Sequence, residues 1–155
     1  MSRGFEPHRT YHIQAHWQSV GCLIVVNKDL TRENTMHKTF IKSKIHRARV
    51  TDANLNYIGS ISIGPEMMEA AGLEPYEFVH VNNLSNAAHW ETYVIPGKSG
   101  EITLNGPPSR LFAPGDLVVV LSFINLEPGE SFQHVTVFVD NNDNNRVVDK
   151  LVGNI

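Results

Sequence analysis

The chain of 155 residues has little of several features that mark particular protein classes. It contains one cysteine, Cys22, which excludes an internal disulfide framework and is typical of proteins from reducing compartments. No apolar run reaches the roughly 18 residues of a membrane span, so we expect no membrane partner. The first twenty residues also lack the apolar segment of a secretory signal, and we therefore expect a cytoplasmic protein.

An excess of basic residues is missing as well. The chain has 13 Lys and Arg residues against 16 Asp and Glu residues, which gives a formal net charge of −3. A surface of this charge argues against nucleic acid as a partner. Hydrophobic residues make up 41% and charged residues 19%, as in an ordinary globular protein long enough to bury a core in one domain.

Short segments with alternating apolar and polar residues, separated by turn residues, dominate the chain from residue 41 onward. Such alternation is typical of half-buried strands, whereas the unbroken apolar run Leu117–Leu121 predicts a fully buried strand. Residues 65–75 predict one short helix, with proline at its start and glycine near its end. The polar cluster 140–145 predicts a turn. We expect strands within residues 44–57, 61–64, 78–84, 90–97, 101–106, 113–123 and, last, 131–140, and therefore a compact all-β barrel or sandwich.

The step Gly59-Ser60 interrupts one of these apolar stretches. One interpretation is structural: Gly59 forms a bulge and Ser60 is an ordinary polar residue on an exposed face. The other is chemical: the Ser60 hydroxyl attacks the Gly59 carbonyl, which requires a strained backbone and hydrogen-bond donors for the oxyanion. Glycine suits this position because it lacks a Cβ and tolerates unusual backbone angles.

The residues around this step favour the chemical interpretation. In the order and spacing of several motifs, residues 36 to about 123 resemble the pyruvoyl-dependent aspartate 1-decarboxylases. The motifs are KIHRARVTDANLNYIGS (44–60), EAAGL (69–73), NNLSNAAHWETY (82–93), LNG (104–106) and PGDLVVVLSF (114–123).

This resemblance implies a six-stranded double-psi β-barrel with one or two short helices. It also implies a zymogen that cleaves itself autocatalytically between Gly59 and Ser60, leaving a covalent pyruvoyl group derived from Ser60. That group would form a Schiff base with the substrate, with no pyridoxal phosphate and no metal. The resemblance further implies a homotetramer with active sites between subunits. The implied reaction is that of a carbon–carbon lyase converting L-aspartate to β-alanine and CO2, for pantothenate and coenzyme A biosynthesis. Whether a maturation factor assists the cleavage stays open.

Roles for individual residues also follow from the resemblance. Thr92 is expected to stabilise the oxyanion formed at Gly59, and Tyr93 to donate a proton to the substrate carbanion. Tyr57 and Asn105 are expected to line the processing site, whereas His46 is expected to be structural. Lys44 is expected to bind a substrate carboxylate across a subunit interface. The full set expected to bind substrate is Lys44, Thr92, His89, Asn105, Gly106, Pro107 and Pro108.

Three departures from the family pattern surround this pocket. The family normally has an arginine at the position of His89, and its loss removes a bidentate carboxylate contact that contributes about 2 kcal/mol. Pro107 and Pro108 stand where small residues normally present backbone N–H groups, and Ala87 replaces a usual glycine. A first alternative is therefore a pyruvoyl-dependent decarboxylase of a different amino acid. A second is an uncleaved, non-catalytic double-psi barrel.

Residues 1–35 differ from the remainder. We interpret them as an N-terminal extension or a wrongly assigned start, because Met36 stands eight residues before Lys44, and we assign residues 36–155 to the decarboxylase domain. The sequence does not indicate a role for residues 124–155. Three histidines in the first segment recur every fourth residue, but successive ones lie about 6 Å apart along a helix and no cysteine or carboxylate completes a ligand set. We therefore expect no metal at His8, His12 and His16.

Overall fold

The computed structural model describes residues 36–57 and 59–154, so the predictions for residues 1–35 lie outside the described part. This part is all-β with one short α-helix and one 3-10 helix, which confirms the predicted class. The elements are β1 (Lys38–Arg49), β2 (Asp52–Asn54), β3 (Ser60–Ile63), α1 (Pro65–Ala71), β4 (Phe78–Asn83), β5 (His89–Pro96), β6 (Ile102–Asn105), η1 (Pro107–Arg110), β7 (Leu117–Leu126), β8 (Gln133–Asp140) and β9 (Arg146–Asn154).

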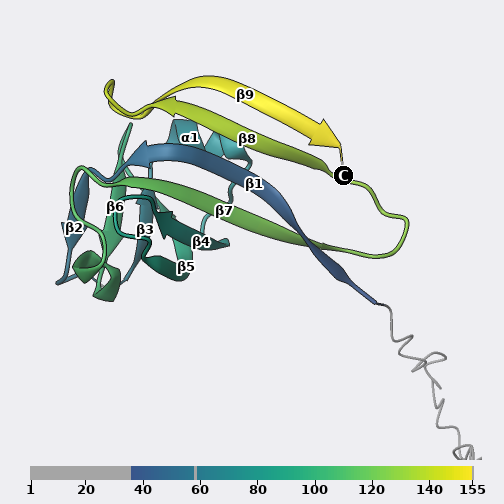
Figure 1. Ribbon diagram of the computed structural model, residues 1–155, viewed down its shortest axis with the longest axis horizontal. Helices are drawn as coiled ribbons and strands as arrows, with labels where there is room; N and C mark the ends of the chain where they lie inside the picture. Colours follow the sequence, from purple (N-terminus) through teal and green to yellow (C-terminus); the bar gives the residue numbers. More distant parts are fainter. Residues whose placement is uncertain (1–35, 58, 155) are drawn as a thin grey trace, which may run out of the picture. The chain divides into compact units, whose positions relative to one another are not determined.

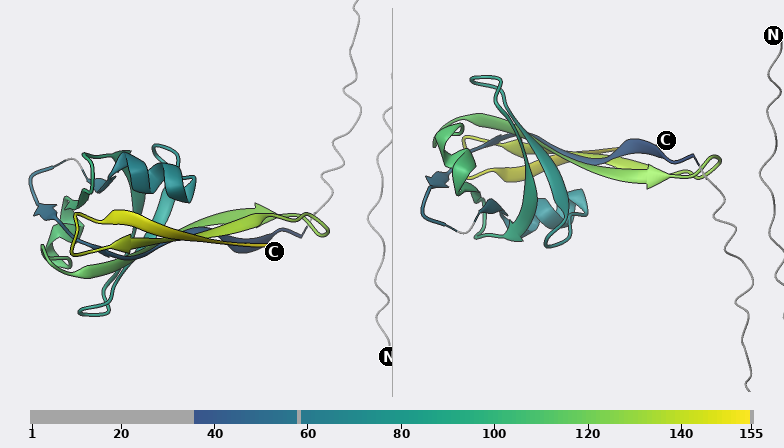
Figure 2. Two further views of the ribbon diagram at one scale, coloured as in Figure 1. Left: turned by 90° about the horizontal axis from the view of Figure 1, so that it is seen from above. Right: turned by 90° about the horizontal axis from the view of Figure 1, so that it is seen from below.

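The strands form one sheet in the order β2-β6-β3-β5-β4-β7-β1-β8-β9 (Figure 1). Its end strands, β2 and β9, do not pair, so this sheet has nine strands and is not closed. The predicted six-stranded double-psi barrel is therefore not confirmed. Three neighbouring pairs are parallel, namely β1–β8, β2–β6 and β3–β5, and the others are antiparallel. Figure 2 shows β1, β7, β8 and β9 running together as a long ribbon.

Two strand predictions need correction. The segment 44–57 is not a single strand. β1 continues past the register shift at Arg47 and ends at Arg49, and β2 begins at Asp52, where the partner changes from β7 to β6. The strand within 131–140 is not the last, since β9 follows it and pairs antiparallel with β8. Strand β9 lies at the edge of the sheet with most of its side chains exposed, so it lacks the apolar alternation that would have revealed it.

Helix α1 forms where the sequence predicts it. Pro65 occupies its first turn, and Gly72 ends it in the left-handed conformation with a φ of +62°. Its apolar side chains Met67, Met68 and Ala71 are buried, and the helix packs against β1, β8 and β9. No helix in the described residues is long and apolar enough to cross a membrane.

The hydrophobic core is built from the inward-facing residues of the strands together with α1. The predicted buried strand is confirmed at its centre, where Val118, Val119 and Val120 are all buried. The largest fully buried side chains are Phe112, Ile45, Ile61, Ile63, Met67, Ile102, Leu104, Val50, Val79, Val81, Val94 and Val118.

Several asparagines attach the turn between β8 and β9 to the rest of the protein, and the buried one is Asn145, which is 1% exposed. Its Oδ1 accepts a hydrogen bond from the Arg49 backbone N–H at 2.7 Å. Its Nδ2 donates to the carbonyls of Arg49 at 2.9 Å and Gly100 at 2.8 Å. The predicted turn at 140–145 is thus confirmed and has a structural role.

We predict that Asn145→Ala lowers the free energy of unfolding by about 3 kcal/mol, because one backbone N–H and two carbonyls lose their partner in a buried position. Denaturant titration followed by circular dichroism measures the loss. Asn142→Ala, in the same turn but exposed, is the matched control and should change stability by less than about 0.5 kcal/mol. Equal effects of the two substitutions would contradict this role of Asn145.

Candidate functional site

The backbone at the start of β3 has a positive φ at two successive residues. Gly59 has a φ of +109° and Ser60 a φ of +95°. A positive φ is ordinary for glycine but unfavourable for serine, whose Cβ then crowds the backbone. Ser60 is 3% exposed, and its hydroxyl has no hydrogen-bond partner among the described residues. The structural interpretation predicted that Ser60 lies on an exposed face, and this prediction is therefore wrong.

Strand β6 fixes this segment from one side. Ser60 is paired with Asn105 in the antiparallel β3–β6 register. The next residue, Gly106, has a φ of +76°, and a Cβ added there would lie 3.2 Å from the Gly59 Cα. The Gly106 N–H donates to the Asn54 carbonyl at 2.8 Å. The two backbones approach so closely that only glycine fits at position 106.

Tyr57 and Asn105, the two predicted processing residues, meet at one pocket. Asn105 is 3% exposed and its Nδ2 donates to the Ser62 hydroxyl at 3.0 Å, whereas Tyr57 is 49% exposed. The pocket has a volume of about 400 Å³. Its lining residues are Asp52, Asn54, Tyr57, Ser62, Ile95, Pro96, Gly97, Lys98, Glu101, Thr103 and Asn105.

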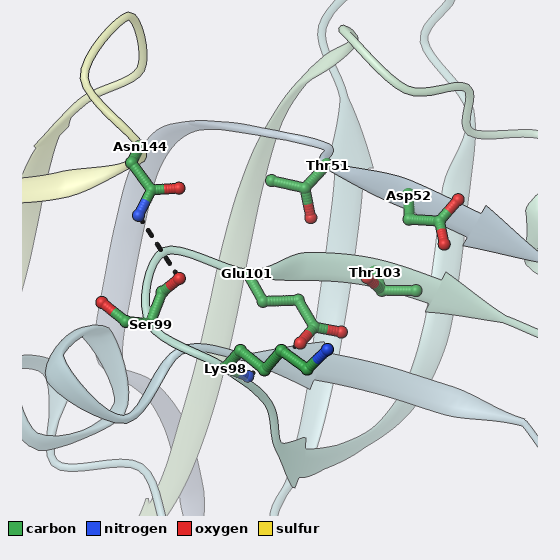
Figure 3. A pocket seen from close by; sticks show the side chains of 7 residues that line it. All are labelled: Thr51, Asp52, Lys98, Ser99, Glu101, Thr103 and Asn144. Atoms are coloured by element: carbon green, nitrogen blue, oxygen red, sulfur yellow. Dashed lines mark hydrogen bonds between the residues drawn. The ribbon is translucent and has the colours of Figure 1, made fainter.

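A second hollow of about 320 Å³ adjoins this pocket and shares four of its residues (Figure 3). The Lys98 and Glu101 side chains run alongside each other within it, and Asn144 donates to the Ser99 carbonyl at 3.3 Å. The shared residues are Asp52, Lys98, Glu101 and Thr103. The processing residues therefore border a polar surface that carries charges of both signs.

The other predicted residues lie on β5, where they alternate between two faces. Tyr93 is 38% exposed, and its ring centroid lies 6.1 Å from that of Tyr76. Thr92 is half-buried and points to the opposite side of the strand from Tyr93. The parallel pair Ile61–Val94 puts Ser60 at the level of Tyr93 in the β3–β5 register.

Lys44 and His89 share the outer face of the sheet with Tyr93. The cross-strand register places Lys44 opposite Leu121, Leu121 opposite His80, and His80 opposite Glu91. Directly opposed residues point to the same face of a sheet, so all four side chains lie on one side. On β5, Glu91 lies two residues from both His89 and Tyr93, which places these on the same side.

These residues do not surround Ser60 within one chain. His89 is four residues from Tyr93 along β5, a separation of about 13 Å. Lys44 lies on β1, four positions from β3 in the sheet order. The structure thus forms two groups, one at the buried Gly59-Ser60 step and one on the outer face.

The three departures from the family pattern have different local structures. Pro107 and Pro108 begin η1, and Pro108 is buried. Ala87 has a φ of +61°, a left-handed conformation that costs a residue with a Cβ about 1 kcal/mol. His89 is hydrogen-bonded through Nδ1 to Asn82 Oδ1 at 2.8 Å, and its Nε2 lies 3.4 Å from Glu91 Oε1.

The environment of His46 is that of a neutral histidine. Its burial, together with the nearby charges of Lys44 and Arg47, holds the pKa of the imidazole below its ordinary value of 6.5. Its ring packs edge-on against Phe138 at 5.6 Å between centroids. This packing is consistent with the expected structural role.

The family model described as aspartate decarboxylase matches residues 36–148, well over half of the chain. The chain belongs to the aspartate decarboxylase family. The aspartate 1-decarboxylase of Pelotomaculum thermopropionicum is 51% identical over 68% of this chain and 83% of its own. That of Salinibacter ruber is 48% identical over 72% and 78%, and that of Bacillus subtilis is 42% identical over 77% and 94%.

Membership of the aspartate decarboxylase family confirms the predicted resemblance and the prediction of a carbon–carbon lyase. The sequence analysis overlooked His80 and Glu91, which the structure places next to His89. The sequence does contain a signal for this group. His89 and Glu91 are two residues apart in the sequence and His80 lies in the predicted strand before them, so all three lie on one face if the register of the hairpin is known.

We predict that Gly106→Ala lowers the free energy of unfolding by about 2–3 kcal/mol, because the strained φ and the contact with the Gly59 backbone both oppose a Cβ. Gly129→Ala is the matched control, since Gly129 has a φ of +93° but nothing within 4 Å of an added Cβ. It should cost only about 1 kcal/mol. Denaturant titration of both variants measures the difference, and equal losses would contradict the close approach of β3 and β6.

Proposed function

We propose that this chain is a self-processing, pyruvoyl-dependent decarboxylase that converts L-aspartate to β-alanine and CO2. The observation that carries the proposal is the buried, unpartnered hydroxyl of Ser60 on a backbone with a φ of +95°, next to Gly59 at +109°. A serine in this conformation is unfavourable unless the surrounding structure imposes it. The names of the relatives favour aspartate over a different amino acid as substrate.

Self-processing begins with the Ser60 hydroxyl. Its oxygen bonds to the Gly59 carbonyl carbon and its proton is released, after which the C–N bond breaks and leaves an ester with a free Ser60 amine. Loss of the Ser60 Cα proton then expels the Gly59 carboxylate and gives dehydroalanine. Water hydrolyses this to a pyruvoyl group and ammonia. Relief of the strained φ of Ser60 lowers the barrier of the first step.

The residues near the peptide bond between Gly59 and Ser60 supply a hydrogen-bond donor for the oxyanion and the space that the backbone needs. Thr92, one residue from the level of Ser60 on β5, would donate its hydroxyl proton to the oxyanion. Asn105, paired with Ser60, holds the strand in register and lines the pocket with Tyr57. Gly106 leaves space for the Gly59 backbone. The residues at this step therefore fit the precursor of a pyruvoyl group.

A pyruvoyl group supplies an electrophilic carbonyl that accepts electrons as CO2 leaves the substrate. Tyr93, at the level of Ser60, would then donate a proton to the resulting carbanion. A phenol with a pKa of about 10 is acidic enough for so basic a carbon. The partial exposure of Tyr93 leaves it open to a substrate.

Substrate binding requires a second subunit in this proposal. Lys44 and His89 lie on the outer face, away from the Ser60 of their own chain. We therefore propose a homotetramer in which this face of one subunit covers the processed site of another, so that Lys44 contacts the substrate carboxylate. Gly106, Pro107 and Pro108 would shape the other wall. We also propose the double-psi topology, which the three parallel strand pairs support.

We predict that the purified chain cleaves into two fragments, the larger with an N-terminal pyruvoyl group that borohydride reduces. Ser60→Ala should abolish both cleavage and CO2 release, because no hydroxyl remains to attack Gly59. Ser43→Ala is the matched control: this serine is equally buried, but its hydroxyl bonds to that of Ser122 on β7. Intact-protein mass spectrometry follows cleavage.

An uncut wild-type chain after prolonged heating would contradict the proposal and favour a non-catalytic protein. Cleavage of the pure chain would also exclude the need for a maturation factor.

We also predict that His89→Arg raises kcat/KM for aspartate about tenfold or more, mainly through KM, because a guanidinium binds a carboxylate with two charge-assisted hydrogen bonds. CO2 release from aspartate measures the effect, and His89→Gln is the uncharged control. The same assay with amino acids that lack a side-chain carboxylate should give no gain. An arginine variant without improvement would contradict the assignment of His89 to the substrate site.

A further inference from the structure

Three side chains with metal-binding atoms meet on the outer face of the β4–β5 hairpin. His80 on β4 is paired with Glu91 on β5, and His89 lies two residues from Glu91 on the same face. One donor atom from each of the three residues lies within 4.8 Å of the others. These are the only three residues of this kind that come together in the described part of the chain.

The distances approach those of a tetrahedral metal site. His89 Nε2 lies 3.4 Å and His80 Nε2 lies 3.8 Å from Glu91 Oε1. Two ligand atoms that each bind one zinc ion at 2.0–2.2 Å in a tetrahedron are about 3.3–3.5 Å apart. The His89–Glu91 distance already has this value, and the other two, at 3.8 Å and at most 4.8 Å, would shorten by side-chain rotation to place all three atoms around one ion.

The orientation of His89 matches that of a metal ligand. Asn82 Oδ1 accepts a hydrogen bond from His89 Nδ1 at 2.8 Å, which leaves the Nε2 lone pair directed toward Glu91. A hydrogen bond of this kind from the second ring nitrogen to an oxygen is usual for histidines that bind metal. The hydrogen bond thus selects the tautomer that a metal needs.

Aromatic neighbours hold the ring of His80 in place. Its centroid lies 4.5 Å from that of Phe123, 5.4 Å from that of Phe78 and 5.0 Å from that of His89. A ring packed on three sides loses little additional freedom when it binds an ion. Its apolar surroundings also reduce competition from water on that side of the site.

We propose that His80, His89 and Glu91 bind a divalent transition metal ion of the zinc type, with water as the fourth ligand. Two imidazoles and one carboxylate suit Zn²⁺ better than Ca²⁺ or Mg²⁺, which prefer oxygen ligands. Three protein ligands leave one position open. The proposal departs from the sequence-based expectation that the protein holds no metal. The one histidine group weighed there was that at positions 8, 12 and 16.

The site is tested by titrating the untagged, full-length chain with zinc sulfate in a calorimeter. The wild-type chain should bind one equivalent at this site. Glu91→Gln and His80→Ala should each weaken that equivalent at least tenfold. His134→Ala is the matched control, a half-buried strand histidine that is bonded to Thr136 outside the cluster, and should leave binding unchanged.

The remaining variants exclude other sources of binding. Replacing the histidines at positions 8, 12 and 16 together by alanine should leave this equivalent in place. Asn82→Ala should weaken binding about tenfold by releasing the His89 ring, and Asn82→Asp should restore it because a carboxylate accepts the same hydrogen bond. Cobalt substitution gives an independent readout, since tetrahedral Co²⁺ absorbs strongly in the visible range.

Absence of zinc binding would overturn the proposal. Binding that survives Glu91→Gln, or that is lost only when the three N-terminal histidines are replaced, would also overturn it. The test does not depend on self-cleavage: uncleaved Ser60→Ala should bind zinc like the wild-type chain. Failure of the metal site and failure of the proposed decarboxylase are therefore separate results.

Discussion

The pairing of β3 with β6 is the constraint on which the candidate site depends. It holds Ser60 opposite Asn105 and brings Gly106 against the backbone of Gly59, so two consecutive residues keep a positive φ that serine alone would not adopt. The buried core on the other side of β3, with Ile61 fully enclosed, prevents the strand from relaxing. Strain of this kind persists only where many contacts determine the backbone.

This constraint explains why the reactive bond and the charged residues are separate in one chain. A buried hydroxyl is protected from bulk water, but a substrate with two carboxylates needs charged partners, which are costly to bury. Lys44 and His89 stay on the outer face, where Lys44 is half-buried and His89 is exposed. Association of subunits would remove water from both groups at once, which strengthens their electrostatic interaction with a bound anion.

The elements that depend on a few neighbouring residues could be predicted from the sequence. Helix α1 was recognisable from Pro65 and Gly72, and the core of β7 from its unbroken valines, because both signals are contained in a few neighbouring residues. The open nine-stranded order and the edge strand β9 depend on pairing between distant segments, which leaves little local trace. In the site, the unusual step Gly59-Ser60 was predictable, whereas His80 joined His89 only through the register of β4 and β5.

The charge balance around His89 links the two proposals. A protonated His89 beside an ionised Glu91 has a net charge of zero, whereas the arginine usual in the family supplies +1. Unit charges 4 Å apart in a partly shielded cleft interact by about 4 kcal/mol, so Glu91 would oppose the approach of a substrate carboxylate as strongly as a protonated His89 favours it. A divalent ion held by two neutral imidazoles and Glu91 has a net charge of +1. The metal site and an arginine at position 89 would thus be alternative sources of the same positive charge, so the gain expected from His89→Arg applies to the metal-free chain.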